Sequence, residues 1–182
     1  MSILLTGFEP FDGAEINPSW EAVCRVADCV AGRTVHKLRL PVVFGEAAEL
    51  LRREISRLQP ETVICCGVAS GRKAVTPELV AINYRHARIP DNAGQQFFAE
   101  QISAEGPAAY MTPLPVHDMI AAMQSAGIPA QLSLSAGAYV CNDVYYALLS
   151  CFERGLFLHV PDADVVDAES AARAITICME HS

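Results

Sequence analysis

The stretch that decides the fold is residues 132–160, which read LSLSAGAYVCNDVYYALLSCFERGLFLHV. Leu132 and Leu134 alternate with polar residues and predict a strand. Residues 140–153 carry a helical pattern, and the apolar run 156–160 predicts a second strand. A strand, a helix and a strand in succession are typical of an α/β protein with a mostly parallel sheet.

A thiol at the start of this helix is the first candidate for chemistry. Cys141 follows a small-residue turn, where backbone N–H groups converge and the helix dipole favours a thiolate. His159 closes the next strand, so both residues are expected at the same edge of the sheet. The alternative is that Cys141 is a buried apolar residue, because it shares a helical stripe with Tyr145, Leu148 and Phe152.

The rest of the chain repeats the alternation of strands and helices. Asn17 and Pro18 are typical of the first positions of a helix, and the Pro/Gly-rich residues 90–115 predict loops. We expect one α/β domain over residues 1–182, with a mostly parallel sheet and helices on both faces. Further strands are predicted at 3–6, within 35–43, at 62–67 and at 79–82, and further helices at 45–58, 118–125 and 167–179.

Composition excludes several classes of function. The chain has 182 residues, 52% of them hydrophobic, and a net charge of −8, so neither nucleic acid nor an anionic membrane is an expected partner. No apolar run is long enough to span a bilayer, and the N-terminus does not resemble a signal peptide. The seven cysteines show no C-x-x-C pair and no zinc-site spacing, which predicts a cytoplasmic protein without a structural metal.

Nucleophilic catalysis by a thiol needs a base and a group that orients the base. His159 is the histidine at a strand end, and an imidazole can take a proton from a thiol near neutral pH. Glu78, directly before an apolar run, is a candidate for orienting it. Asp162 and Asp164 are alternatives, and spacing alone does not choose among the three carboxylates.

A loop with two aromatic residues follows the first strand. Phe8 and Phe11 flank Pro10, and they either pack the loop onto the sheet edge or form an apolar slot for a small ring. Asn17 can add polar recognition to such a slot. The glycines form neither G-x-G-x-x-G nor a P-loop, so no nucleotide cofactor is expected.

Taken together, the motifs resemble those of the pyroglutamyl peptidase I (pyrrolidone-carboxylate peptidase) family of cysteine exopeptidases. The resemblance runs nearly end to end. The blocks that carry it are LLTGFEPF (4–11) with NPS (17–19), GVASGR (67–72), ELVAIN (78–83), ARIPDN (87–92), GPAAY (106–110), SAGAYVCN (135–142) and FLHVP (157–161).

The resemblance implies a three-layer α/β/α, phosphorylase/hydrolase-like fold and hydrolysis of the amide bond after an N-terminal pyroglutamyl residue. It implies Cys141 as nucleophile, His159 as general base and acid, and Glu78 as the residue that orients the histidine. It also implies peptide substrates, no metal or organic cofactor, and assembly as a dimer or tetramer. The implied substrate-binding residues are Phe8, Phe11, Asn17, Val68, Arg88, Tyr139 and Val140.

The chain departs from the family pattern at five positions. These are Val68, Ser70, Leu79, Leu134 and Asp143, where glutamine or leucine, glycine, arginine, asparagine and histidine are respectively more usual. None of them is the cysteine, the histidine or the glutamate, so the resemblance still implies activity. The alternative is a non-catalytic relative that binds a lactam or a modified peptide N-terminus.

Overall fold

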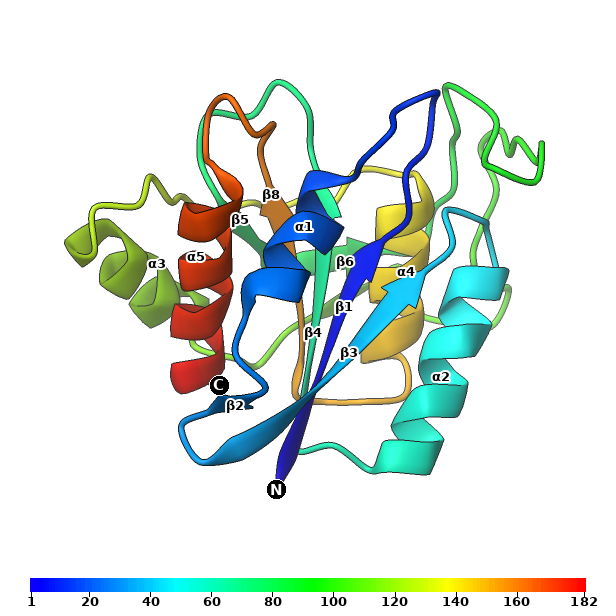
Figure 1. Ribbon diagram of the computed structural model, residues 1–182. Helices are drawn as coiled ribbons and strands as arrows, with labels where there is room; N and C mark the ends of the chain where they lie inside the picture. The colour runs from blue at the N-terminus through cyan, green and yellow to red at the C-terminus, as the bar shows by residue number, and fades with distance from the viewer.

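A computed structural model describes residues 1–182, and its centre is a six-stranded sheet in the order β2-β3-β1-β4-β8-β5. The four inner strands are parallel, and the edge strands β2 and β5 are antiparallel to their neighbours. The carboxyl ends of the inner strands lie together at the upper edge in Figure 1. The strands are β1 (Ser2–Phe8), β2 (Cys29–Val30), β3 (Arg33–Leu40), β4 (Thr62–Val68), β5 (Thr76–Glu78) and β8 (Gly155–Val160). A separate antiparallel pair is formed by β6 (Val80–Ile82) and β7 (Ala109–Met111).

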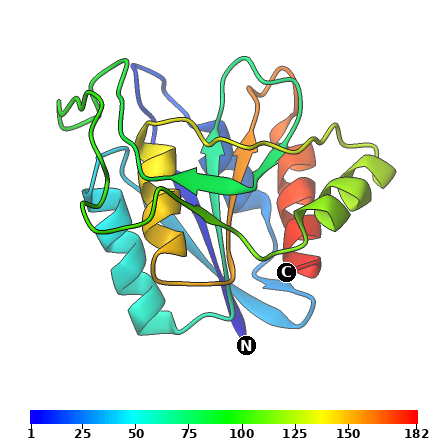
Figure 2. The same ribbon diagram turned by 180° about the vertical axis from the view of Figure 1, so that it is seen from behind.

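Helices cover both faces of the sheet, which confirms the predicted three-layer α/β/α architecture. The helices α1 and α5 pack on one face, with α3 beside α5, and α2 and α4 pack on the other (Figures 1 and 2). None of them is long and apolar enough to cross a membrane. They are α1 (Pro18–Arg25), α2 (Glu46–Leu58), α3 (Val116–Ser125), α4 (Val140–Leu149) and α5 (Ala168–Glu180).

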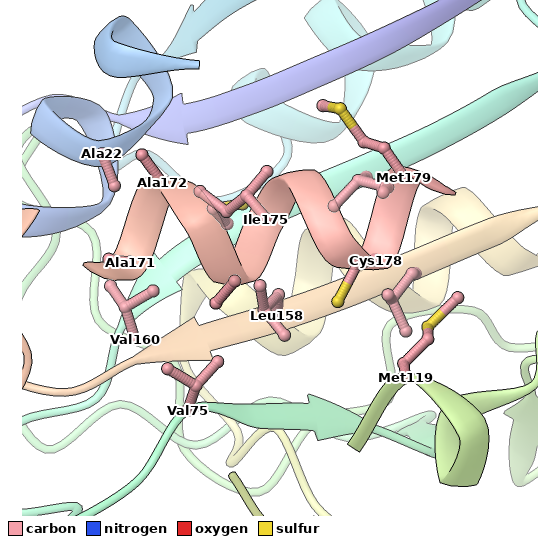
Figure 3. Packing of buried hydrophobic residues seen from close by; sticks show 14 of the residues in the cluster. Ala22, Val75, Met119, Leu158, Val160, Ala171, Ala172, Ile175, Cys178 and Met179 are labelled. Carbon is pink, nitrogen blue, oxygen red and sulfur yellow. The ribbon is translucent and has the colours of Figure 1, made fainter. Parts of the chain in front are cut away.

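The larger core lies between the sheet and α5. Ala171 and Cys178 of α5 lie over Val160 and Leu158 of β8, and Met119 of α3 closes the far side (Figure 3). Because the sheet is covered on both faces, its inner strands β1, β4 and β8 are buried along almost their whole length, as parallel strands usually are.

Alternation along β8 determines where its one polar side chain lies. Leu156 and Leu158 belong to the core under α5, whereas Phe157 belongs to the core under α2 and α4. Successive side chains point to opposite faces of a strand, so His159 shares the α4 face with Phe157. The ring centroids of these two residues are 4.8 Å apart.

Most predicted elements are confirmed, and two helices begin at their expected capping residues. Asn17 caps α1 by accepting a hydrogen bond from the Ser19 N–H, with Pro18 at the first helical position. The closing helix begins after Asp167, which accepts a hydrogen bond from the Ser170 N–H. The patterns at 45–58, 62–67 and 118–125 correspond to α2, β4 and α3, although α3 begins two residues earlier, at Val116.

The predicted strand at Leu132 and Leu134 is wrong. This segment makes only two isolated parallel bridges with the neighbourhood of β5, one between Val75 and Ala130 and one between Glu78 and Ser133. Two alternating leucines are too short a pattern to predict a strand: Leu132 packs against the core, but Leu134 is 62% exposed.

Other boundaries differ because local chemistry stops an element or pairs it elsewhere. The strand expected at 79–82 is β6, which pairs with β7 rather than joining the main sheet, and β7 lies within residues 90–115, where the sequence predicts loops. The strand in the 35–43 region ends at Leu40, directly before Pro41. The helix predicted over 140–153 ends at Leu149.

A buried ion pair fixes the position of α4. Asp143, fully buried in its first turn, accepts hydrogen bonds from the Arg85 guanidinium and from the Gly45 N–H at 3.0 Å. The pair joins α4 to the segment after β6 and to the start of α2. Burial of the charges makes the bond structural rather than a solvated surface contact.

Asp143→Ala therefore leaves the Arg85 charge without its partner. We expect the free energy of unfolding to fall by about 3–5 kcal/mol, the usual effect of breaking a buried pair. Urea denaturation followed by circular dichroism measures it. Glu153→Ala, at an exposed position, is the matched control, and equal effects of the two changes would contradict a structural role for the pair.

Candidate active site

A pocket of about 480 Å³ opens at the carboxyl edge of the sheet. It brings together nine of the ten residues predicted for the site, from separate parts of the chain. These are Phe8, Phe11, Asn17, Val68, Arg88, Tyr139, Val140, Cys141 and His159. The tenth, Glu78, lies behind His159 and is completely buried. The volume is within the range of pockets that bind small molecules.

The Cys141 thiol lies over Gly67 of β4, a position without a side chain. A Cβ atom placed on Gly67 would be 2.9 Å from Cys141 Sγ and 2.9 Å from Phe157 Cζ, so only glycine fits under the thiol. In the sheet register Gly67 is the partner of His159. Cys141 and His159 therefore occupy neighbouring positions on the same face of the sheet.

The His159 imidazole is held by a carboxylate from the edge strand. Its Nδ1 is 2.7 Å from Glu78 Oε1, and both side chains are buried. Burial alone would raise the pKa of this carboxyl, but the hydrogen bond from His159 and the positive charge of Arg72 hold that pKa below its usual value. Nδ1 therefore donates its proton to Glu78, which leaves Nε2 as the acceptor of the neutral ring.

The other two carboxylates considered for this role lie elsewhere. Asp162 accepts hydrogen bonds from Ser70 Oγ at 2.8 Å and from the Gly71 N–H at 3.1 Å, so it stabilises the loop after β4. Asp164 is exposed. Glu78 is thus the carboxylate bonded to His159.

Burial sets the ionisation of the thiol and the imidazole. It raises the pKa of Cys141 to about 12, with the Glu78 charge acting in the same direction and Arg72 opposing it. The expectation of a resting thiolate is therefore wrong, because the pocket walls outweigh the helix start. Burial also lowers the pKa of His159, against the influence of Glu78. The resting pair is a thiol and a neutral imidazole.

Two phenylalanines line the pocket, in different environments. Phe8 is the last residue of β1 and is only 2% exposed, with its ring centroid 6.3 Å from that of Phe157, so the expectation of a loop residue is wrong for it. Phe11 is half-buried against Tyr139, with 6.2 Å between ring centroids. The Tyr139 hydroxyl donates to the Pro90 carbonyl at 2.9 Å, which ties this wall to the loop carrying Arg88.

Asn17 is mainly structural. Its Oδ1 accepts from the Ser19 N–H and hydroxyl, and its Nδ2 donates to the Glu9 carbonyl at 2.9 Å. One N–H of the amide is left for a ligand in the pocket. Arg88 is exposed at the rim and supplies a positive charge there.

One residue of the site was not singled out from the sequence. Arg72, in the loop after β4, lines the pocket and donates to Glu78 Oε1 at 2.7 Å. The sequence carried a signal for it, since it is the one cation in the GVASGR block that follows a strand end. Its partner, Glu78, lies six residues further along the chain, at the end of β5. The sequence did not predict this strand, so spacing did not reveal the contact.

Comparison with known proteins first identifies the general class of the chain: it is a peptidase. The family model that matches residues 1–177 is described as pyroglutamyl peptidase. A pyrrolidone-carboxylate peptidase of Bacillus subtilis (strain 168) is 46% identical over 166 residues, which cover 87% of this chain and 77% of the relative. The Lactobacillus helveticus (strain DPC 4571) protein of the same name is 43% identical over 88% of this chain and 84% of its own.

Solved structures agree with the sequence relatives. Pyroglutamyl peptidase I of Bacillus amyloliquefaciens superimposes with a TM-score of 0.91 at 38% identity, over 99% of this chain and 95% of that chain. A mutant pyrrolidone carboxyl peptidase from Pyrococcus furiosus gives 0.94 at 34% identity, over 100% and 97%. The chain belongs to the pyroglutamyl peptidase family and is a hydrolase. Its expected assembly as a dimer or tetramer stays a prediction.

The contact between Cys141 and Gly67 can be tested by a double-mutant cycle. Gly67→Ala should lower the free energy of unfolding by about 1–3 kcal/mol, because the new methyl group overfills the site. Combined with Cys141→Ala, which removes Sγ, the loss should shrink, with a coupling of about 0.5–3 kcal/mol. Thermal and urea unfolding of the four proteins measure it. Strictly additive effects would mean that the thiol does not lie over Gly67.

Proposed function

We propose that this chain removes an N-terminal pyroglutamyl residue from peptides by hydrolysing the amide bond that follows it, with Cys141 as the nucleophile. The observation that carries the proposal is the Glu78–His159 hydrogen bond placed beside Cys141 in one pocket. The family membership supports the substrate class, since its relatives are named for this activity.

In the first step His159 acts as a general base. Its Nε2 takes the proton of the Cys141 thiol while Sγ attacks the carbonyl carbon of the pyroglutamyl group. The imidazolium formed is stabilised by the ionised Glu78 and then gives its proton to the leaving amine. The C–N bond breaks, and the products are a thioester on Cys141 and the shortened peptide.

In the second step the same groups act on water. His159 takes a proton from a water molecule that attacks the thioester, and returns a proton to Sγ as L-pyroglutamate leaves. Both tetrahedral intermediates carry a negative oxygen. The start of α4 has no side-chain cap, so its first-turn N–H groups, including that of Cys141, are the natural donors to this oxygen.

Recognition of the lactam follows from the make-up of the pocket. The pyroglutamyl group is uncharged and has an apolar ring face, which suits the rings of Phe8 and Phe11. Its lactam N–H and carbonyl need polar partners, and the free Asn17 N–H is one candidate. A proline residue lacks the lactam carbonyl, so polar partners would be left unpaired with it.

A pyroglutamyl arylamide, offered beside its prolyl analogue under reducing conditions, tests the proposed function. We expect hydrolysis of the first and much slower release from the second. Cys141→Ser should reduce kcat/KM by roughly 10⁴-fold or more, as loss of a nucleophile does in other hydrolases.

Cys24→Ser, which changes an exposed thiol far from the pocket, is the matched control and should retain full activity. Equal turnover of the two substrates, or full activity in Cys141→Ser, would refute the assignment. A non-catalytic lactam-binding protein would bind pyroglutamate and release no product.

The pH dependence of kcat/KM reports the resting state of His159. The neutral imidazole is the active form, so activity is lost as pH falls through its pKa. Because burial lowers that pKa, the midpoint of the acid limb should lie below 6.5, the ordinary value for histidine. A midpoint above 6.5 would contradict a neutral resting imidazole.

Glu78→Gln separates orientation from ionisation in the same experiment. The glutamine side chain would keep an oxygen near Nδ1 but remove the charge that raises the pKa of His159. We expect kcat to fall by roughly 10²–10⁴-fold and the acid limb to move to still lower pH. A limb that stays in place would argue against a direct Glu78–His159 contact.

A further inference from the structure

Arg72 joins three segments of the site through one guanidinium group. It lies in the loop after β4 and donates to Glu78 Oε1 at 2.7 Å and to the Thr76 hydroxyl, both in β5. Its other terminal nitrogen donates to the Ser135 carbonyl at 3.1 Å, in the segment that leads into α4 and Cys141. These three acceptors engage both terminal nitrogens of the guanidinium, although its side chain lines the pocket and is 25% exposed.

The contact with Glu78 involves the oxygen that also holds the histidine. Arg72 Nη1 and His159 Nδ1 are both 2.7 Å from Oε1 of Glu78. The second oxygen, Oε2, is buried and has no hydrogen-bond partner. The carboxylate is therefore held chiefly by two donors that converge on one atom, and loss of Arg72 would remove the guanidinium charge from that contact.

Arg72 also balances the charge of the buried carboxylate. Glu78 is completely inaccessible to water, so its negative charge acts strongly on its neighbours. The groups facing His159 are Glu78 from β5, Arg72 from the loop after β4 and the Cys141 thiol from α4, with Arg88 at the rim of the same pocket. Asp162, just after β8, is engaged by the loop at Ser70.

We propose that Arg72 is a positioning residue, which acts through Glu78 to aim the His159 imidazole at Cys141 and to keep that imidazole uncharged. The role rests on the proposed function, in which a neutral His159 accepts the proton of the thiol. Arg72 does not itself touch the scissile bond.

The balance of charge explains why a cation is needed beside the Glu78 carboxylate. Without Arg72, the Glu78–His159 pair would carry an uncompensated negative charge and bind a proton more readily. If that proton sits on His159, the imidazole is already charged. If it sits on Glu78, the carboxyl donates to Nδ1 and the ring proton moves to Nε2. His159 cannot accept the thiol proton in either form.

Direct titration of His159 by NMR, together with the pH profile of kcat/KM, tests the proposal. The imidazole signal is assigned by its loss in His159→Gln. In Arg72→Met we expect this titration and the acid limb of kcat/KM to move together to higher pH, opposite to the shift in Glu78→Gln. We also expect kcat to fall by roughly 10- to 100-fold, with KM changed far less.

Arg72→Lys restores one positive charge without the two-armed geometry. Its His159 titration should return towards the wild-type position, while kcat stays partly reduced because the Ser135 contact is lost. Arg173→Met, on the exposed side of α5, is the matched control and should change neither quantity. Arg72→Gln serves as the neutral variant if Arg72→Met does not fold, which circular dichroism establishes beforehand.

Three results would overturn the proposal. They are an unchanged His159 titration in the neutral variants, a raised KM with kcat and the titration unchanged, and a lysine variant whose titration matches that of the methionine variant. The second result would make Arg72 a substrate-binding residue. Because the NMR titration needs no turnover, failure of the proposed function, seen as no hydrolysis by the wild-type protein, remains distinguishable from failure of this inference.

Discussion

The site depends on one constraint, which is that a fully buried carboxylate must be paired. Glu78 has no access to water, and an isolated charge there would cost several kcal/mol or more. Two cationic or proton-donating groups, Arg72 and His159, meet it at Oε1, and each comes from a different part of the sheet edge. Its backbone is fixed as well, because the Tyr145 hydroxyl donates to the Glu78 carbonyl at 2.8 Å. The antiparallel strand β5 is thus held at the sheet edge by the hydrogen bonds that Arg72, His159 and Tyr145 make with Glu78, its last residue.

The alternation of side chains in the sheet places the remaining groups. Cys65, Gly67, Phe157 and His159 all face α4, and the missing side chain at Gly67 is the space that the thiol occupies. The pocket and the smaller apolar core therefore share one face of the sheet, with the chemistry at the carboxyl end and the packing below it. A shift of register by one residue in β8 would turn His159 into the core under α5.

Sequence patterns predicted the parts of this arrangement that arise from local order. Strand–helix alternation predicted the layers, and the positions of Cys141 and His159 along their elements predicted the common edge. Glu78 came from the family resemblance, because three carboxylates were equally acceptable by spacing. Neither β5 nor Arg72 was predicted, since a three-residue strand containing Pro77 has no periodicity and its pairing with β8 depends on residues about 80 positions away. Phe8 was misplaced for a related reason: the strand continues two residues beyond the apolar run that predicted it.

The ionisation of the thiol shows how two general effects compete at one residue. A helix start stabilises a thiolate, but the effect is modest and weakens outside the first turn, whereas enclosure by apolar walls penalises any charge. At Cys141 enclosure prevails, and the site rests without a thiolate–imidazolium pair. An uncharged resting pair suits an uncharged lactam, because the substrate displaces water from neutral groups rather than from ions. Charge then develops only as Sγ attacks, where the helix start, Glu78 and Arg72 are already oriented to stabilise it.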